Sequence, residues 1–329
     1  MRLPSRLNSY RDFDAAVLSA RQQCTSTGPR FDRENFLNSM YYLLGWFLGD
    51  LGKQFGSIRL TTAGLNLTLT KRHPENQALG DVVFFQCVQT LGIQARRQPD
   101  REPDRSSQYG AYRWDCRRSP LFGWFHLVCL GLEWEQRASS DPVRMDWILG
   151  APSRRRLWFI RGVADSDGDV HFNDRSVGIT TTPNTALLFA LLESVGCTPR
   201  AEVDGRSNKV VITVKHAAQI EIFNPRLLTY RRRTLVSLAT AKTFERRWPA
   251  WLQDEVTTLL NSGAGAREIR DKVLEDHHVF IRLATLRRKR LEANPSQKVP
   301  REGFAPSTSG PGGNAPPRVP QITLPSPGL

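Results

Sequence analysis

The chain contains two apolar segments that end in the same pattern of small and acidic residues. The first reads LLGWFLGDL (residues 43–51), and in it Gly45 and Gly49 stand four residues apart just before Asp50. Small residues at this spacing lie on one face of an α-helix and let a second helix backbone approach closely. The rest of the segment is apolar nearly all round, which is typical of a buried helix. The pattern therefore predicts a buried helix that packs against a partner with a matching face.

The second segment, IRGVADSDG (160–168), supplies that partner. Here Gly162 and Ser166 precede Asp167 by the same offsets. If the two helices pack along their small faces, Asp50 and Asp167 meet at the same end of the pair. Two carboxylates beside two negative helix ends repel each other unless a cation lies between them. Oxygen ligands of this kind suit a hard divalent ion, so the pattern predicts a Mg²⁺ (or Mn²⁺) site for phosphodiester hydrolysis, with Asp50 and Asp167 as metal ligands.

The charge of the chain points to a polyanionic partner. Its 329 residues carry a formal net charge of +14, which favours binding to nucleic acid or to an anionic membrane surface. A basic surface that serves only solubility remains open as an alternative. Since no apolar run is long enough for a membrane-spanning helix, we expect double-stranded DNA as the partner, with RNA possible and no membrane. The five scattered cysteines form no CxxC pair, so a reducing, cytoplasmic and DNA-associated setting is expected.

The sequences that follow the two segments share one order of elements. After the first come LNLTLTK (65–71), a helical stretch, two further strand-like stretches and PLFGWFHLVCLGL (120–132). After the second come SVGITTTP (176–183), a helix, a hairpin and AAQIEIFN (217–224). Periods of two in the strands and of 3.6 in the helices predict helix, two strands, helix, two strands, helix in each half. The first half has a longer Arg- and Asp-rich loop at 98–108.

At this point the chain resembles the LAGLIDADG homing endonucleases, through LLGWFLGDL and IRGVADSDG. The resemblance implies an α+β fold in which two pseudo-symmetric αββαββα repeats form a saddle. It further implies a monomeric, site-specific endonuclease that makes a metal-dependent double-strand break, with Asp50 and Asp167 as catalytic and metal-binding residues. Gly45, Gly49, Gly162 and Ser166 would form the helix–helix interface. The first segment departs from the motif at Leu48, where an acidic residue is common, and at Leu51, where Gly is usual.

The family also has a basic residue from each half near the scissile phosphates. By this resemblance Lys215, at the end of VVITVK, takes that role in the second half, and Arg118 (or Arg117) takes it in the first. A cation there would stabilise the charge that develops in phosphoryl transfer. The alternation in LNLTLTK also leaves a polar strand face for DNA contacts, although a solvated sheet face predicts the same pattern. The predicted contact residues of the two sheets are Asn66, Thr68, Thr70, Lys71, Thr180 and Thr182.

The C-terminal part carries a different pattern. Residues 250–293 read as three short helices with a glycine turn, NSGAG, after the first. The stretch resembles a resolvase-like helix-turn-helix, which would place the last helix in the major groove. A three-helix packing unit with a solvated basic face is the alternative. The residues predicted to contact DNA are Arg282, Thr285, Arg287 and Arg288.

The domain boundaries follow from these patterns. A Pro/Gly/Ser-rich end is expected to be disordered because it cannot bury enough apolar area to offset its ordering entropy. A basic helix before the three-helix unit either follows a phosphate backbone or is a solvated connector. The predicted parts are an N-terminal extension (1–34), repeat 1 (35–134), a linker (135–154), repeat 2 (155–229), the basic connector helix (230–249), the helix-turn-helix (250–293) and the tail (294–329).

Two alternatives to the nuclease remain open. Some relatives combine this fold with a helix-turn-helix and act as non-cleaving DNA-binding transcriptional regulators, as in the WhiA family. Others are RNA-splicing maturases. Because a regulator is free to lose both aspartates, the presence of Asp50 and Asp167 favours the nuclease.

Overall fold

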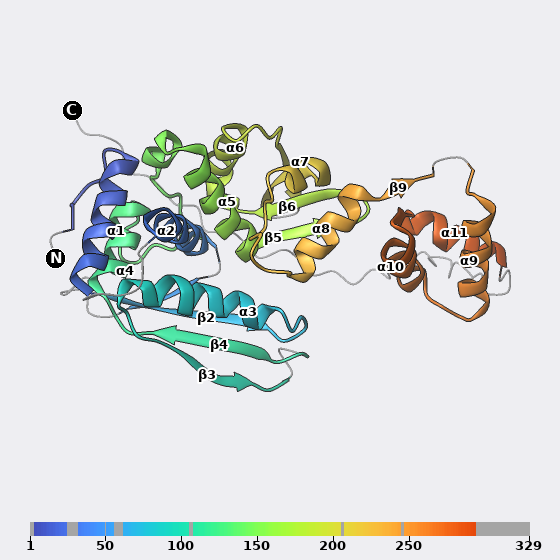
Figure 1. The fold of residues 1–329 in the computed structure, drawn as a ribbon, viewed down its shortest axis with the longest axis horizontal. Helices are drawn as coiled ribbons and strands as arrows, with labels where there is room; N and C mark the ends of the chain where they lie inside the picture. The colour runs from blue at the N-terminus through green and yellow to red at the C-terminus, as the bar shows by residue number, and fades with distance from the viewer. Residues whose placement is uncertain are drawn as a thin grey trace, which may run out of the picture.

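The computed structural model describes residues 3–24, 32–49, 51–55, 62–104, 108–204, 207–244 and 247–293. Asp50 and the predicted tail lie outside the described residues. One hydrophobic core extends through both predicted repeats. A second, smaller core belongs to the C-terminal helices, which lie at the opposite end of the molecule from the N-terminal helix (Figure 1).

Two helices form the centre of the large core, as the small-residue spacing predicts. They are α2 (Arg33–Leu48) and α5 (Ser153–Asp167). α2 begins at Asp32, whose side chain accepts a hydrogen bond from the Asn35 amide and so satisfies one of the free N–H groups of the first turn. From Phe36 to Leu48 all but one of its residues are buried, because the helix has neighbours on every side.

The first half of the core is completed by a four-stranded antiparallel sheet with helices on one face. Its strands lie in the order β1-β2-β4-β3. The Trp114 indole packs against Gly80 and donates a 2.9 Å hydrogen bond to Asp81, which fixes the helix to the sheet. The elements are β1 (Gly52–Phe55), β2 (Ala63–Thr70), α3 (Asn76–Asp81) with its π-helical continuation (Val82–Val88), β3 (Ala95–Arg101), β4 (Ala111–Cys116) and α4 (Pro120–Trp124) with its π-helical continuation (Phe125–Cys129).

The second half has the same strand order, β5-β6-β8-β7, again all antiparallel. Its elements are β5 (Gly168–His171), β6 (Ser176–Thr180), α6 (Thr185–Glu193), β7 (Arg200–Asp204), β8 (Ser207–Thr213) and α7 (Val214–Gln219). Counting α2 and α5, both halves follow the predicted order of helix, two strands, helix, two strands, helix.

Several boundaries differ from the predictions, and the closing helix of the second half, α7, ends at Gln219 instead of residue 224. β3 runs to Arg101, so part of the predicted loop at 98–108 is strand. The pairing register shifts between Gln98 and Arg101, after which Arg101 pairs with Ala111 of β4. In the second half, the strand containing VVIT ends at Thr213 and α7 starts at Val214. The Thr213 hydroxyl accepts a hydrogen bond from the His216 amide, and this N-cap begins the helix earlier than the sequence alone suggests.

The N-terminal extension is part of the core. α1 (Tyr10–Cys24) packs against α2, and its Phe13 ring is fully buried among the rings of Tyr41, Trp124 and Trp147. Trp147 lies in the predicted linker, in the 3₁₀ helix Asp146–Gly150. The linker is therefore packed into the core through that tryptophan.

The predicted connector is shorter than expected and is bound to both halves. Of its described residues, those of α8 (Tyr230–Thr240) are helical, and a short strand, β9 (Lys242–Thr243), follows them. Arg231 of α8 donates a 2.6 Å hydrogen bond to the Asp165 carbonyl in the second half. Arg233 forms an ion pair with Glu75 of the first half. These contacts favour the connector interpretation over that of a helix lying along DNA.

The C-terminal residues form the three predicted helices, α9 (Ala250–Asn261), α10 (Ala266–His277) and α11 (Leu283–Ala293). Leu252, Val256, Ile269, Val273 and Leu286 are buried between them. A strand, β10 (Val279–Phe280), separates α10 from α11 and pairs with β9 in parallel. We call residues 248–293 the three-helix module. Within the described part of the chain, no helix is long and apolar enough to cross a membrane.

Candidate functional site

α2 and α5 cross with their backbones in contact. A Cβ atom on Gly45 would lie 2.9 Å from the Gly162 Cα and would overlap the Phe159 carbonyl oxygen. A Cβ on Gly162 would overlap the Tyr42 carbonyl oxygen. These approaches are closer than the contacts that Cβ atoms make in proteins, so only glycine fits at either position. The predicted interface of small residues is therefore where these two helices meet.

One turn further along, the ends of the two helices lie against each other. A Cβ on Gly49 would stand 2.7 Å from the Asp167 Oδ2 atom and would overlap the Ser166 hydroxyl. Ser166 turns that hydroxyl back onto its own helix, where it donates to the Val163 carbonyl at 3.0 Å. The Asp167 carboxylate thus lies across the helix pair beside the residue that precedes Asp50 in the chain.

A second carboxylate of the motif has a structural role. Asp165 is buried, and its Oδ2 atom accepts hydrogen bonds from the Tyr42 hydroxyl at 2.7 Å and from the Asn224 amide at 3.1 Å. Burial raises the pKa of Asp165 to about 6. In α2 the matching position is Leu48, so this link between helix and closing loop exists in the second half alone.

The metal prediction rests on Asp167 and Asp50. Among the residues that the structure describes, no group of three or more His, Cys, Asp or Glu side chains is placed to hold a metal ion. Asp50 is not among those residues. The donor that is described, a carboxylate at the end of α5 lying beside Gly49, has the oxygen chemistry that Mg²⁺ prefers. A pair of carboxylate donors for the ion therefore requires Asp50, the residue that follows Gly49, in addition to Asp167.

The first sheet turns a polar face away from its helices. Leu65 and Leu67 of β2 are buried, whereas Thr68 and Thr70 are exposed. In the register of the sheet, Asn66 lies opposite Asp115, and Thr68 lies opposite Arg113. Two hydrogen bonds from the Arg96 guanidinium, at 2.7 and 3.0 Å, lower the pKa of the Asp115 carboxyl. The predicted contact Lys71 sits at the edge of this face and forms ion pairs with Asp100 (3.2 Å) and Glu102 (3.5 Å).

The second sheet has a face that is polar around Lys209, whereas Val211 in the next row of that face is buried. Val210 and Ile212 of β8 point into the core, so Lys209 and its neighbours on alternate positions lie on the other side. Thr180 is exposed and pairs with Lys209. The adjacent row pairs Gly178 with Val211, which in turn pairs with Arg200. The side chain of the predicted contact Thr182 lies outside the described part of the structure.

The strand register points to two basic residues, Lys209 and Arg113, that the sequence analysis did not name. Gly168, the residue after Asp167, pairs with Ile179, and the next pair is Thr180 with Lys209. In the first half the corresponding pair is Thr68 with Arg113. Lys215 instead lies exposed in the first turn of α7, beyond the opposite end of β8, and Arg118 lies exposed between β4 and α4. The order of strands in the sheet, which a single sequence does not reveal, is the only signal for Lys209 and Arg113.

In the three-helix module, the predicted contacts Arg282, Thr285 and Arg288 line one groove, whereas Arg287 is not among the residues that line it. Arg282, Arg287 and Arg288 are exposed and Thr285 is half-buried. Arg288 has a loose ion pair with Glu292 at 3.8 Å. This exposed basic face agrees with a nucleic-acid contact and equally with a solvated surface.

Comparison with known proteins yields matches among solved structures. No family model and no curated protein matches the chain. The homing endonuclease I-DmoI in complex with DNA and Mn matches with 17% identity and a TM-score of 0.36, over 57% of this chain and 97% of its own. The homing endonuclease I-WcaI bound to its DNA recognition sequence matches with 11% identity and a TM-score of 0.42, over 64% and 97%. The chain resembles homing endonucleases. Full-length WhiA from Thermatoga maritima is also similar, with 10% identity and a TM-score of 0.41 over 79% of each chain.

Proposed function

We propose that this protein is a site-specific DNA endonuclease that needs a divalent metal ion and cuts both strands of duplex DNA. The observation that carries the proposal is the crossing of α2 and α5. Their glycine contact places the Asp167 carboxylate beside Gly49, the residue that precedes Asp50. A helix pair with no chemical role has no reason to end in two acidic residues, because carboxylates at helix C-termini oppose the helix dipole.

The surroundings of Asp167 support a duplex as the substrate. Each sheet has a basic residue in a strand pair near the end of its central helix, α2 or α5. This residue is Arg113 in the first sheet and Lys209 in the second. Thr68 and Thr180 lie in the same rows and offer hydroxyl groups to phosphates or base edges. Two such faces on one chain match the two strands of a duplex.

In the proposed mechanism, Asp50 and Asp167 would hold a Mg²⁺ or Mn²⁺ ion through their carboxylate oxygens. When bound, the ion would supply positive charge to the reacting phosphate and lower the pKa of a bound water. Lys209 and Arg113 would bind the flanking phosphates and hold the duplex in register. Tyr42 and the Asn224 amide, by fixing Asp165, would keep the end of α5 in place beneath Asp167.

The test begins with the full chain and a randomised duplex library. DNA that the protein retains is sequenced, the selected site is placed in a plasmid, and cutting is measured with Mg²⁺. We expect Asp167→Asn to lower the cutting rate by about 10²-fold or more while leaving the affinity for DNA unchanged. Asp146→Asn is the matched control, since this exposed carboxylate begins the 3₁₀ helix of the linker and belongs to neither sheet. Equal loss in both variants would count against the proposal.

The second candidate is a DNA-binding regulator that does not cut. The feature that favours it is the three-helix module, which adds a second basic surface to the core. In the same experiment, a wild-type chain that binds its selected site tightly yet never nicks it with Mg²⁺ or Mn²⁺ would decide for the regulator. Preferential retention of structured RNA over duplex DNA would decide for a maturase.

A further inference from the structure

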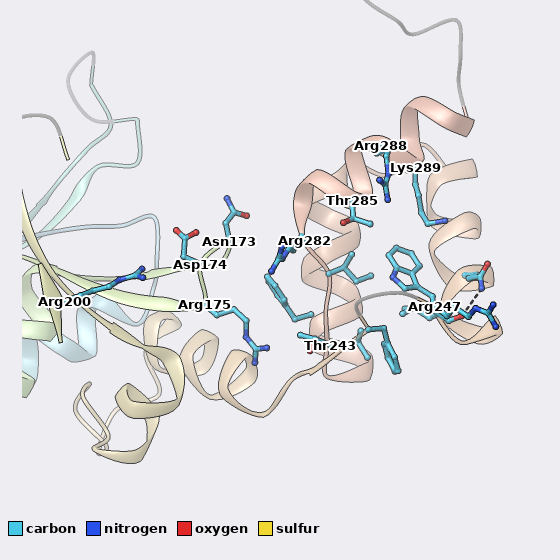
Figure 2. Close-up of a pocket in the computed structure, with 17 residues that line it drawn as sticks. Asn173, Asp174, Arg175, Arg200, Thr243, Arg247, Arg282, Thr285, Arg288 and Lys289 are labelled. Atoms are coloured by element: carbon cyan, nitrogen blue, oxygen red, sulfur yellow. Dashed lines mark hydrogen bonds between the residues drawn. The ribbon is translucent and has the colours of Figure 1, made fainter. Parts of the chain in front are cut away.

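A groove separates the second sheet from the three-helix module. It has a volume of about 1210 Å³ and is lined on one side by the β5–β6 turn and the start of β7, and on the other by residues around α11. In Figure 2, Arg200 reaches into the gap from the core, and Arg282 points toward it from the module. The lining includes six basic side chains and a single acidic one, Asp174; the basic ones are Arg175, Arg200, Arg247, Arg282, Arg288 and Lys289.

The two walls of the groove are fixed to each other by specific contacts. The Arg270 guanidinium of α10 lies 3.8 Å from the centre of the Phe172 ring, which belongs to the β5–β6 turn. Arg270 is buried, so this contact is shielded from water. From the opposite direction, Arg175 donates a 2.6 Å hydrogen bond to the Leu238 carbonyl and lies 5.5 Å from the Phe280 ring of β10.

The backbone adds to this junction. β9, which follows α8, pairs with β10 of the module, and the Lys242 amide donates to the His278 carbonyl at 2.9 Å. Because α8 is itself bound to both halves of the core through Arg231 and Arg233, the module has little freedom to swing. The distance from the second sheet to α11 is therefore set by the fold.

The basic groove is also continuous with the polar face of the second sheet. Arg200 pairs with Val211 on the face that carries Lys209 and Thr180, and the same side chain lines the groove. The Arg200 side chain is 60% exposed even though its guanidinium forms an ion pair with Glu202 at 2.8 Å. A phosphate backbone that leaves the sheet in the direction of α11 meets Arg200 first and Arg282 next.

From these contacts we propose that the groove binds the sugar-phosphate backbone of duplex DNA beyond the second sheet. The three-helix module then contacts DNA at one set distance from the centre of the site, and only on the side of the second half. This inference rests on the proposed DNA-binding function and adds an asymmetric flank to it. The first half has no such extension in the described part of the chain.

The experiment is hydroxyl-radical footprinting of the full chain on its selected site, with Ca²⁺ in place of Mg²⁺ to prevent cutting. We expect protection at the centre plus an extension on one side only. The double variant Arg200→Ala/Arg282→Ala should lose the extension, keep the central protection, and lower the salt slope of binding by about 1 to 2, since each phosphate contact contributes about 0.9. Arg11→Ala, an exposed arginine on α1 at the far end of the molecule, is the control and should change neither.

The outcomes separate the two proposals. Symmetric central protection in the wild type, or an extension that survives in the double variant, would overturn the groove assignment and leave the endonuclease proposal standing. No protection of any duplex would overturn both. An independent measurement uses Phe172→Ala, which removes the ring that Arg270 contacts and should loosen the junction. Inserting five base pairs between the centre of the site and its flank should then lower the affinity for DNA less in this variant than in the wild type. An equal loss of affinity in the two proteins would contradict the fixed distance.

Discussion

Gly45 and Gly162 face each other where α2 and α5 cross, so closely that a Cβ on Gly162 would lie 3.0 Å from the Gly45 Cα. This contact sets the separation of the two helices and hence the position of everything at their ends. It also makes the interface intolerant of a single added methyl group, because the nearest atoms on each side belong to backbone, which cannot move aside as a flexible side chain can.

The first prediction concerns this crossing. Gly45→Ala and Gly162→Ala should each lower the free energy of unfolding by about 1 to 3 kcal/mol, the usual cost of overpacking a core. The measurement is equilibrium unfolding in urea. Gly150→Ala is the matched control, because a Cβ there would meet nothing within 4 Å. A stability loss as large in Gly150→Ala as in the other two would show that the crossing is not the cause.

The second prediction separates two candidate basic residues of the second half. The sheet register places Lys209 in the row next to Asp167, whereas Lys215 lies on α7 beyond the other end of β8. We therefore expect Lys209→Ala to slow cutting by about tenfold or more, and Lys215→Ala to slow it by less. Single-turnover rates on the selected site decide between them. A larger loss in Lys215→Ala would restore the position implied by the family resemblance.

The third prediction is a pH dependence of stability. Asp14 of α1 is largely buried beside Tyr41 and Arg155, and its burial raises the pKa of this carboxyl above the ordinary value of 3.8. Between the unfolded value, about pH 4, and that raised pKa, the folded chain keeps a proton that the unfolded chain has lost. The stabilisation is therefore complete below about pH 4 and is lost as the pH rises through the raised pKa.

The substitution that tests this is Asp14→Asn, which keeps an acceptor for the Tyr41 hydroxyl and cannot titrate. Unfolding in urea is followed at a series of pH values from about 4 upward. The decline with pH should be smaller in the variant than in the wild type. Identical slopes would show that another buried carboxyl with a raised pKa, such as Asp165, carries the dependence.

The fourth prediction compares two adjacent arginines of α8. Arg231 donates a 2.6 Å hydrogen bond to the Asp165 carbonyl, whereas Arg232 forms a long ion pair with Glu221 at 4.0 Å. Arg231→Met should lower the free energy of unfolding by about 1.5 kcal/mol, since it leaves a buried carbonyl without its charged donor. Arg232→Met should change it by less than about 0.5 kcal/mol. Equal effects would mean that α8 contributes only general packing.

Much of the fold could be predicted because its signals are local. The spacing of Gly45, Gly49, Gly162 and Ser166 indicated the helix pair, and alternation in LNLTLTK indicated β2. The partners of charged side chains could not be predicted in this way. The arginines of α8 read as a solvent-facing basic helix, yet two of them bind Asp165 and Glu75. Arg155 of α5 is likewise buried against Asn38 and Glu34, because the folded chain supplies acceptors that no local pattern specifies.

The candidate site was predictable to the same extent. The acidic motif position led directly to Asp167, whose carboxylate lies across the helix pair from Gly49. Lys209 and Arg113 were missed because their relation to Asp167 arises from strand register, which depends on pairing between segments far apart in sequence. The groove at Arg200 and Arg282 was missed for the same reason, since its walls come from β7 and from the residue before α11.

The attachment of α8 bears on how this protein could be divided or recombined. Its residues precede the three-helix module in sequence, but their contacts with Asp165 and Glu75 join α5 of the second half to the start of α3 in the first half. A protein engineer who wishes to exchange the terminal module for another should therefore cut after Thr240. A cut before Tyr230 would remove the contacts of Arg231 and Arg233, and with them one support of the end of α5 that carries Asp167.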